Sequence, residues 1–120
     1  MSEPVGRPWL PRYDAHVPPE FEPDVRDGVE LFERGARERP DDPAILYFET
    51  AISFRAAATH AHAVATALRK LGLRPGDRVA LMLQNVPQMV IALHAVWLAG
   101  GVVTTVNPMN KRRELEHQLT

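Results

Sequence analysis

Few side chains in this chain combine the residue type and the spacing that chemistry requires. His60 and His62 stand two positions apart, so on a helix they point to different faces and do not share a metal ion. Glu114 and His117 have the i, i+3 spacing of a carboxylate–imidazole metal pair, but a single pair without partners favours an exposed helix face. The basic run at 111–113 is typical of a solvated helix start and is at most a phosphate contact. The sequence therefore predicts no metal site.

The motifs that bind phosphate or activate a nucleophile do not occur either. The sequence contains neither G-x-G-x-x-G nor G-x-x-x-x-G-K-[ST], and it contains no G-x-S-x-G turn. The chain has no cysteine, which excludes disulfides and thiolate chemistry. We predict no catalytic residue and no cofactor-binding residue in this chain.

One loop is nevertheless placed where a ligand could bind. Asn107 and Pro108 follow an apolar, strand-like run, and ligands of open α/β sheets bind beyond the carboxyl ends of the strands. We predict that a substrate pocket wall, completed by other parts of the protein, contains Asn107, Pro108, Met109 and Asn110.

The composition is that of an ordinary soluble globular protein, with room for one domain at most. Hydrophobic residues make up 45% and charged residues 24% of the chain, and the net charge is −1. This balance gives no indication of a nucleic-acid partner. The absence of cysteine fits a reducing compartment, and we expect the protein to be cytoplasmic.

Residues 89–106 require a membrane test, because 18 positions without Asp, Glu, Lys or Arg reach the lower limit for a membrane span. The pair Gly100-Gly101 splits this run into a helix-like half (MVIALHAVWLA) and a β-branched half (VVTTV). We predict a buried helix followed by a buried strand, and no membrane span. The sequence leaves open whether the protein makes a peripheral contact with a membrane.

Residues 1–26 are rich in proline, and no helix or central strand is expected there because each ring fixes φ and removes a hydrogen-bond donor. The segment is too apolar for a plain linker, since it contains Trp9, Leu10, Tyr13, Val17 and Phe21. We predict an extended arm that lies over a surface of its own chain or of a partner. A homodimer formed through the arm is one such arrangement.

A helix is predicted to begin at Asp27, which caps it with Glu30 in capping-box spacing, and to end before Pro40. A short hairpin follows, with strands at 44–48 and 52–54. Ser53 is the predicted cap of a second helix over about 54–71. The spacing predicts that its apolar stripe consists of Ala57, Ala61, Val64, Leu68 and Leu71.

Two strand–helix units come next. The strand at 78–83 is an apolar run typical of a buried parallel sheet, and the helix at 85–98 has Asn85 as its predicted cap and Pro87 in its first turn. A strand at 102–106 completes a right-handed parallel crossover. Residues 114–120 open a further helix without a stop signal, so we expect the chain to continue.

The predicted fold class is therefore α/β, with parallel βαβ units preceded by a helix and a short hairpin. We predict two parts, the arm at 1–26 and an incomplete N-terminal α/β subdomain at 27–120.

Several stretches, in this order, resemble the AMP-forming acyl-CoA synthetases, also called adenylate-forming ligases. They are RPWLPRYDAHVP in the arm, LFERGARERPDDPAILYF, LGLRPGDRVALMLQNVPQ, and AGGVVTTVNP followed by RRELEHQL. Within the family the chain is most similar to the N-terminal portion of bacterial long-chain fatty-acid–CoA ligases. It departs at Ala56, where the family has a capping Glu, and at 109–111, where the family tends to Leu-Tyr-Thr.

The resemblance implies the N-terminal segment of the large domain of such a ligase, and a two-step reaction for the parent enzyme. A fatty-acid carboxylate attacks the α-phosphate of Mg·ATP to give an acyl-adenylate and pyrophosphate, and the thiol of coenzyme A then displaces AMP. The family's catalytic elements lie further along its sequences. ATP, Mg²⁺ and coenzyme A are therefore implied for the parent only, and the 120 residues alone are predicted to be inactive.

Two alternatives stay open from the sequence. One is another adenylate-forming ligase that acts on short-chain, aromatic or amino-acid carboxylates. The other is a self-contained α/β interaction module that adenylates nothing. The unfinished final helix is an argument against this second alternative.

Overall fold

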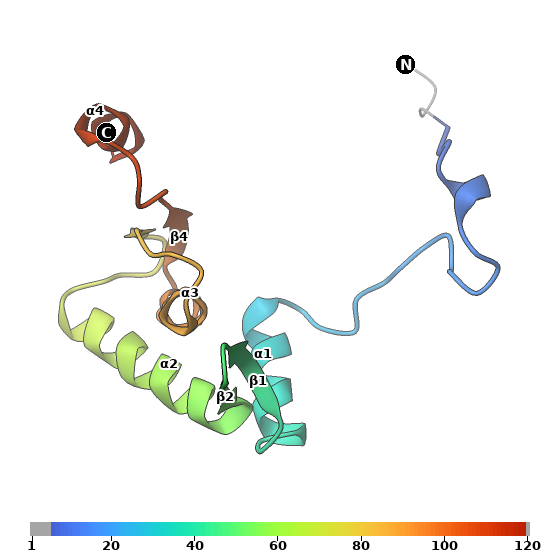
Figure 1. The fold of residues 1–120 in the computed structure, drawn as a ribbon, viewed down its shortest axis with the longest axis horizontal. Helices are drawn as coiled ribbons and strands as arrows, with labels where there is room; N and C mark the ends of the chain where they lie inside the picture. The colour runs from blue at the N-terminus through green and yellow to red at the C-terminus, as the bar shows by residue number, and fades with distance from the viewer. Residues whose placement is uncertain (1–5, 120) are drawn as a thin grey trace.

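The computed structural model describes residues 6–119, in which helices and short strands alternate along the chain (Figure 1). In chain order the elements are the 3₁₀ helix η1 (Leu10–Arg12), α1 (Gly28–Glu38), β1 (Pro43–Tyr47), β2 (Thr50–Ser53), α2 (Phe54–Lys70), β3 (Arg78–Leu81), α3 (Pro87–Leu98), β4 (Val102–Thr105) and α4 (Arg112–Leu119). Positions 1–5 of the predicted arm and Thr120 of the predicted last helix lie outside the described residues. The α/β class is confirmed.

The strands pair in two separate two-stranded sheets. β1 and β2 form the predicted antiparallel hairpin. β3 and β4 are parallel, from Arg78 opposite Val102 to Leu81 opposite Thr105, and α3 connects them. The parallel βαβ unit and the helix and hairpin that precede it are therefore as predicted.

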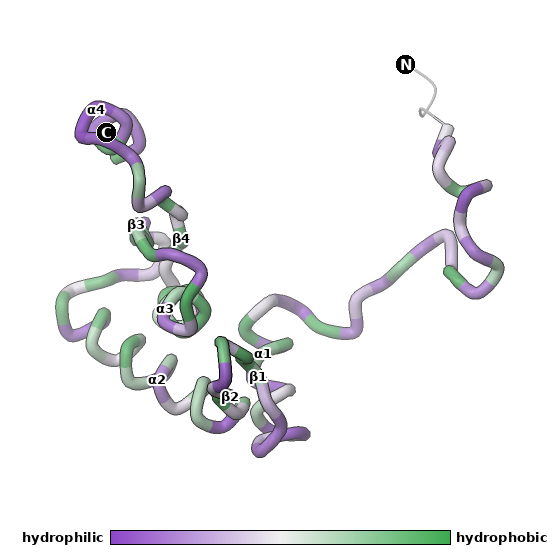
Figure 2. The backbone as a smooth tube through the Cα atoms, viewed as in Figure 1, coloured by the Kyte–Doolittle hydropathy of each residue, from purple (hydrophilic) through white to green (hydrophobic). Residues whose placement is uncertain are grey.

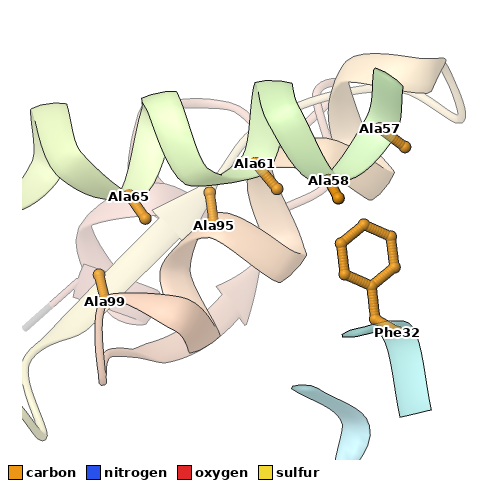
Figure 3. Packing of buried hydrophobic residues seen from close by; sticks show 7 residues of the cluster. All are labelled: Phe32, Ala57, Ala58, Ala61, Ala65, Ala95 and Ala99. Carbon is orange, nitrogen blue, oxygen red and sulfur yellow. The ribbon is translucent and has the colours of Figure 1, made fainter. Parts of the chain in front are cut away.

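The core is built mainly from alanines. Helices α2 and α3 meet through Ala57, Ala61 and Ala65 of α2 and Ala95 of α3, each of which is 0% exposed (Figure 3). Because alanine carries nothing beyond Cβ, the two helices can approach closely and their burial costs no side-chain entropy. Phe32 of α1 adds a large aromatic ring to the same cluster.

The predicted apolar stripe of α2 is wrong in part. Val64 is 38% exposed, and Leu71 follows the helix as its C-cap and is 84% exposed. Ala58 and Ala65 are buried in their place. The helix presents its alanines to α3 because small side chains fit the close approach, and the branched side chain of Val64 is turned to the rim.

A glycine and an aromatic ring hold α1 against the start of α2. A Cβ at Gly35 would lie 2.6 Å from Cε1 of Phe54, closer than Cβ atoms come to other heavy atoms. The guanidinium carbon of Arg39 lies 5.6 Å from the centre of the Phe54 ring, a cation–π distance. The close approach therefore requires glycine at position 35.

Side chains cap α1 and α2 as the sequence predicts. Asp27 Oδ1 accepts a hydrogen bond from the backbone N–H of Glu30 (2.8 Å), and this bond lowers the pKa of Asp27 below its ordinary value, with a further contribution from Arg26. Ser53 Oγ accepts one from the N–H of Ala56 (3.2 Å). Both bonds satisfy a donor of the first turn that has no partner inside the helix.

The predicted cap at Asn85 is wrong. Helix α3 begins at Pro87, its N-cap is Val86, and no side chain forms a cap hydrogen bond there. A proline in the first turn has no N–H to satisfy and holds the residue before it extended, as Val86 is (φ −119°, ψ 161°). Asn85 therefore lies one residue too early to cap the helix.

The described part of the arm differs from its prediction in one respect, because residues 10–12 form the 3₁₀ turn η1, and proline is tolerated in the first turn of a helix. The prediction placed the arm over its own chain or over a partner, and residues 6–22 project away from the helices of their own chain (Figure 1). Trp9, Tyr13 and Phe21 are 50%, 45% and 79% exposed, and hydrophobic residues are spread along the arm (Figure 2).

The alanine contact predicts a sharp size limit at position 61. Ala61→Leu should lower the free energy of unfolding by about 1–3 kcal/mol, because the added atoms overpack the contact between α2 and α3. Ala63→Leu is the matched control, since Ala63 is exposed on the same helix, and it should change the stability by less than about 0.5 kcal/mol. Urea unfolding followed by circular dichroism measures both, and equal losses in the two variants would contradict the packing described.

Candidate functional site

A pocket of about 590 Å³ lies at the carboxyl ends of β3 and β4. Here we name it the β3–β4 pocket. Its lining residues are Leu81, Leu83, Gln84, Asn85, Met89, Thr105, Val106, Asn107, Pro108 and Met109. This is the edge of a parallel sheet at which ligands of open α/β folds bind.

Backbone hydrogen bonds shape the pocket. The N–H of Val106 donates to the carbonyl of Leu81 (2.9 Å) and continues the parallel pairing beyond β4. Val106 is 4% and Leu81 8% exposed, so both side chains are buried where the strands end. On the other side the N–H of Val86 donates to the carbonyl of Gln84 (2.8 Å), and this tight turn leads into α3, whose first turn carries Met89.

The predicted loop turns directly at the pocket. Asn107 Oδ1 accepts a hydrogen bond from the N–H of Met109 (3.0 Å), and the carbonyl of Asn107 accepts one from the N–H of Asn110 (2.9 Å). A side chain that bonds the backbone two residues on forms an Asx turn, which Asn favours. Met109 is left 84% exposed beside the pocket.

The structure brings three of the four predicted wall residues together. Asn107, Pro108 and Met109 line the pocket, whereas Asn110 does not. The side-chain amide of Asn110 donates instead to Oε1 of Gln118 on α4 (3.1 Å). Asn110 therefore lies on the side of the loop that faces the last helix.

The half of the pocket that follows β3 is not among the residues predicted from the sequence. Leu83, Gln84, Asn85 and Met89 come from this connection, and Asn85 lies in the pocket wall where the sequence had suggested a helix cap. The rule that located Asn107 would have found them, because parallel strands end at the same edge of a sheet.

The lining residues determine what the pocket can do. It combines aliphatic and thioether side chains with the amides of Gln84, Asn85 and Asn107 and the hydroxyl of Thr105. None of the lining residues is acidic, basic or a histidine. The pocket can therefore hold an apolar or neutral group, but none of its lining side chains can act as an acid or a base.

Two of the side chains noted in the sequence, His62 and Glu114, take structural roles. His62 Nε2 lies 2.7 Å from Oε1 of Glu33 and links α2 to α1. Glu114 Oε2 accepts a hydrogen bond from the N–H of Lys111 (2.6 Å) at the start of α4. Between residues 6 and 119, no group of three or more His, Cys, Asp or Glu side chains could hold a metal ion.

A second concavity, of about 670 Å³, lies beside α1 and α3; we name it the α1–α3 groove. Its apolar lining includes Leu31, Phe32, Ile45, Phe54 and Val90, together with the ring of His94. That ring stacks on Phe32 with centroids 4.0 Å apart, and its Nδ1 lies 2.8 Å from the carbonyl of Val90.

The arm joins the body of the chain at the groove. Asp24 and Arg34 both line the groove and form an ion pair with N–O distances of 2.7 and 3.3 Å. The hydrogen bond from the Arg34 guanidinium, together with its charge, holds the pKa of Asp24 below its ordinary value. The last residues of the arm are thus fixed to α1.

Comparison with known proteins gives consistent matches. A family model described as AMP-binding enzyme matches residues 32–120. A long-chain-fatty-acid–CoA ligase of Yersinia pestis is 45% identical over 114 residues, which are 93% of this chain and 20% of the relative. One of Bacillus subtilis is 37% identical over 113 residues, which are 94% of this chain and 20% of the relative. The chain spans about a fifth of the length of these curated relatives.

Among solved structures, the chain is similar to the N-terminal subdomain of Klebsiella oxytoca NpsA in complex with 3-hydroxyanthranilyl-AMSN. The TM-score is 0.76 at 25% identity, and the match covers 79% of this chain and 24% of that one. The family model begins at Phe32, after the arm. The two curated matches leave out less than 10% of the chain, so they extend into residues 1–26.

The Asx turn at the pocket predicts a loss of stability when its acceptor is removed. Asn107→Ala should lower the free energy of unfolding by about 0.5–1.5 kcal/mol, whereas Asn107→Asp keeps the acceptor and should cost less. Asn85→Ala is the control, because Asn85 caps no helix, and it should stay within about 0.5 kcal/mol of the parent. Denaturant unfolding of the three variants makes the comparison. If Asn85→Ala lowered the free energy of unfolding as much as Asn107→Ala, Asn85 would have to be a helix cap after all.

Proposed function

Because this chain belongs to the AMP-binding enzyme family, we propose that it is the N-terminal segment of an AMP-forming long-chain fatty-acid–CoA ligase. The observation that carries the proposal is the identity to long-chain ligases, which continues from the arm through the α/β segment. The fold supports it, since it is similar to the N-terminal subdomain of an adenylate-forming enzyme. The lower identity to NpsA makes other adenylate-forming ligases the weaker alternative, and a self-contained interaction module has no observation in its favour.

In the complete enzyme the proposed reaction has two steps. An oxygen of the fatty-acid carboxylate bonds to the α-phosphorus of ATP and releases pyrophosphate, and the sulfur of coenzyme A then bonds to the acyl carbon and releases AMP. The β3–β4 pocket has no ionisable lining residue, and the described part of the chain has no metal-ligating cluster. We assign both steps, and the binding of ATP, Mg²⁺ and coenzyme A, to the rest of the enzyme.

The β3–β4 pocket is proposed to contribute one wall of the site for the acyl chain. Its buried floor of Leu81 and Val106 and its exposed Met109 suit a methylene chain, since burying apolar surface is favourable by about 25 cal/mol per Å². The neutral amides at its edge suit a region that holds no charge.

The same proposal includes the organisation and location of the enzyme. Residues 1–26 act as an arm that joins two copies of the enzyme, and residues 27–120 form the first part of a larger α/β subdomain. The location is cytoplasmic, and peripheral contact with a membrane is compatible with it. Across residues 6–119, the structure has no helix whose length and apolar character would let it cross a bilayer.

The proposal predicts that adenylation requires the full-length protein. With palmitate, Mg²⁺ and labelled pyrophosphate, the full-length enzyme should incorporate label into ATP. The 120-residue chain should stay at the level of a blank without protein, because the catalytic elements of the family lie further along its sequences. Exchange by the 120-residue chain, or exchange by the full-length enzyme only with amino-acid or aromatic carboxylates, would contradict the proposal.

The pocket wall is tested by adding bulk at position 109. In the full-length enzyme Met109→Trp should raise the KM for palmitate by about five-fold, because the larger side chain overpacks the acyl site. The KM for ATP should change by less than two-fold, since no phosphate contact is altered.

Leu71→Trp provides the matched control for this variant. Leu71 and Met109 are both 84% exposed, and Leu71 lies at the end of α2 outside the pocket. Leu71→Trp should leave both constants unchanged. An unchanged KM for palmitate in Met109→Trp, with the protein folded, would remove this loop from the acyl site.

A further inference from the structure

The α1–α3 groove follows one face of α1 from the first residue of that helix to its C-cap. The lining residues on this face recur every three or four positions, and they are Gly28, Leu31, Phe32, Gly35, Glu38 and Arg39. At a rise of about 1.5 Å per residue, the segment from Gly28 to Arg39 spans about 16 Å. The groove is therefore elongated, as a site for an extended chain has to be.

The walls of the groove are apolar. The lining residues that other elements contribute to these walls are Ala44, Ile45, Phe54, Val90 and His94. Leu31 is 53% and Val90 37% exposed, so both helices offer apolar surface that water covers. A volume of about 670 Å³ with mainly apolar walls and few polar groups is typical of a site for a small molecule.

Four charged side chains border the groove, and three of them act on one another. The hydrogen bond of the Asp24–Arg34 ion pair raises the pKa of the Arg34 guanidinium, and the charges of Asp24 and Glu38 add to the rise. Arg39 forms no ion pair with a carboxylate of residues 6–119, and its guanidinium carbon lies 5.6 Å from the centre of the Phe54 ring. Arg39 is therefore the cation that remains for an anion in the groove.

The charges at the groove favour a ligand with a single negative charge. A phosphate ester or a nucleotide carries more than one, and the carboxylates of Asp24 and Glu38 would repel it. A single carboxylate matches the guanidinium of Arg39, which can donate two parallel hydrogen bonds to it. The apolar walls require that the rest of the ligand be hydrocarbon, since a polar group buried there would lack partners.

We propose that the α1–α3 groove binds a long-chain fatty acid, with the carboxylate on Arg39 and the alkyl chain along α1 between Leu31 and Val90. This site is separate from the β3–β4 pocket, because the two concavities share no lining residue. The choice of a fatty acid rests on the proposed function, whereas the position of the site rests on the groove alone.

Binding of labelled palmitate to the full-length protein, measured by equilibrium dialysis without ATP or coenzyme A, tests the proposal. The protein should bind a second palmitate in addition to the one at the acyl site. Arg39→Gln should weaken this second binding by about ten-fold or more, because a charge-assisted hydrogen bond is lost. Arg37→Gln is the matched control, since Arg37 is also exposed near the end of α1 but lies outside the groove, and it should leave both dissociation constants unchanged.

Glu38→Gln provides a test in the opposite direction. It removes a like charge from the border of the groove, so it should strengthen the second binding by about two-fold or more. A variant that merely disturbed the fold would weaken binding, and a gain therefore reports on the charge itself.

The length of the ligand tests the apolar part of the site. Each methylene that the groove covers contributes about 0.8 kcal/mol, so shortening the chain should weaken the second binding by about four-fold per methylene removed. Hexadecyltrimethylammonium, which has a chain of the same length and a positive charge, should not displace palmitate from the groove.

Photolabelling locates the ligand in the parent protein, without a substitution. Palmitic acid with a diazirine in the distal half of its chain should label peptides of α1 and α3 that contain Leu31 and Val90. An excess of unlabelled palmitate should prevent the labelling.

Two results would overturn the inference, namely no labelling of α1 and α3, and a second binding that Arg39→Gln leaves unchanged. Pyrophosphate exchange with palmitate is measured separately. Exchange together with an unlabelled groove would remove the second site and leave the proposed function intact. A labelled groove in a protein without exchange would support the site and contradict the proposed function.

Discussion

The close contact between α2 and α3 is the constraint on which the rest of the structure depends. Alanines of both helices meet there, so α3 is held at a fixed distance from α2. Because α3 is the connection between β3 and β4, its position also determines where β4 returns beside β3. At Gly101 the chain passes so close to α3 that a Cβ would lie 2.9 Å from Cγ1 of Val96. The contact thus fixes the edge at which the β3–β4 pocket forms.

This way of building a core has an energetic consequence. A buried alanine removes much less apolar surface from water than a buried leucine or phenylalanine. The contact between α2 and α3 therefore fixes the distance between the helices more than it stabilises the fold. Large side chains such as Leu46, Phe48 and Met109 remain 74–91% exposed. A segment that buries small residues and exposes large ones suits an assignment as one part of a larger enzyme, in which further surfaces cover it.

The two concavities differ in their position and in their lining. The β3–β4 pocket lies at the ends of parallel strands, and none of its lining side chains is ionisable. The α1–α3 groove lies beside the ion pair of Asp24 and Arg34, where the arm begins. Packing of side chains defines the β3–β4 pocket. The surroundings of the α1–α3 groove depend instead on the Asp24–Arg34 ion pair and on the prolines that keep the arm away from its own chain.

The sequence by itself determined the elements whose cause is local. The caps Asp27 and Ser53 and the turn at Asn107 each follow from residues within a few positions of one another, and the strand–helix–strand order follows from the pattern inside each element. Tertiary structure alone decided which face of α2 is buried, because that depends on the small residues that α3 presents, as the exposed Val64 shows. It also decided the pocket half after β3 and the course of the arm, since both arise from segments that meet only in the folded chain.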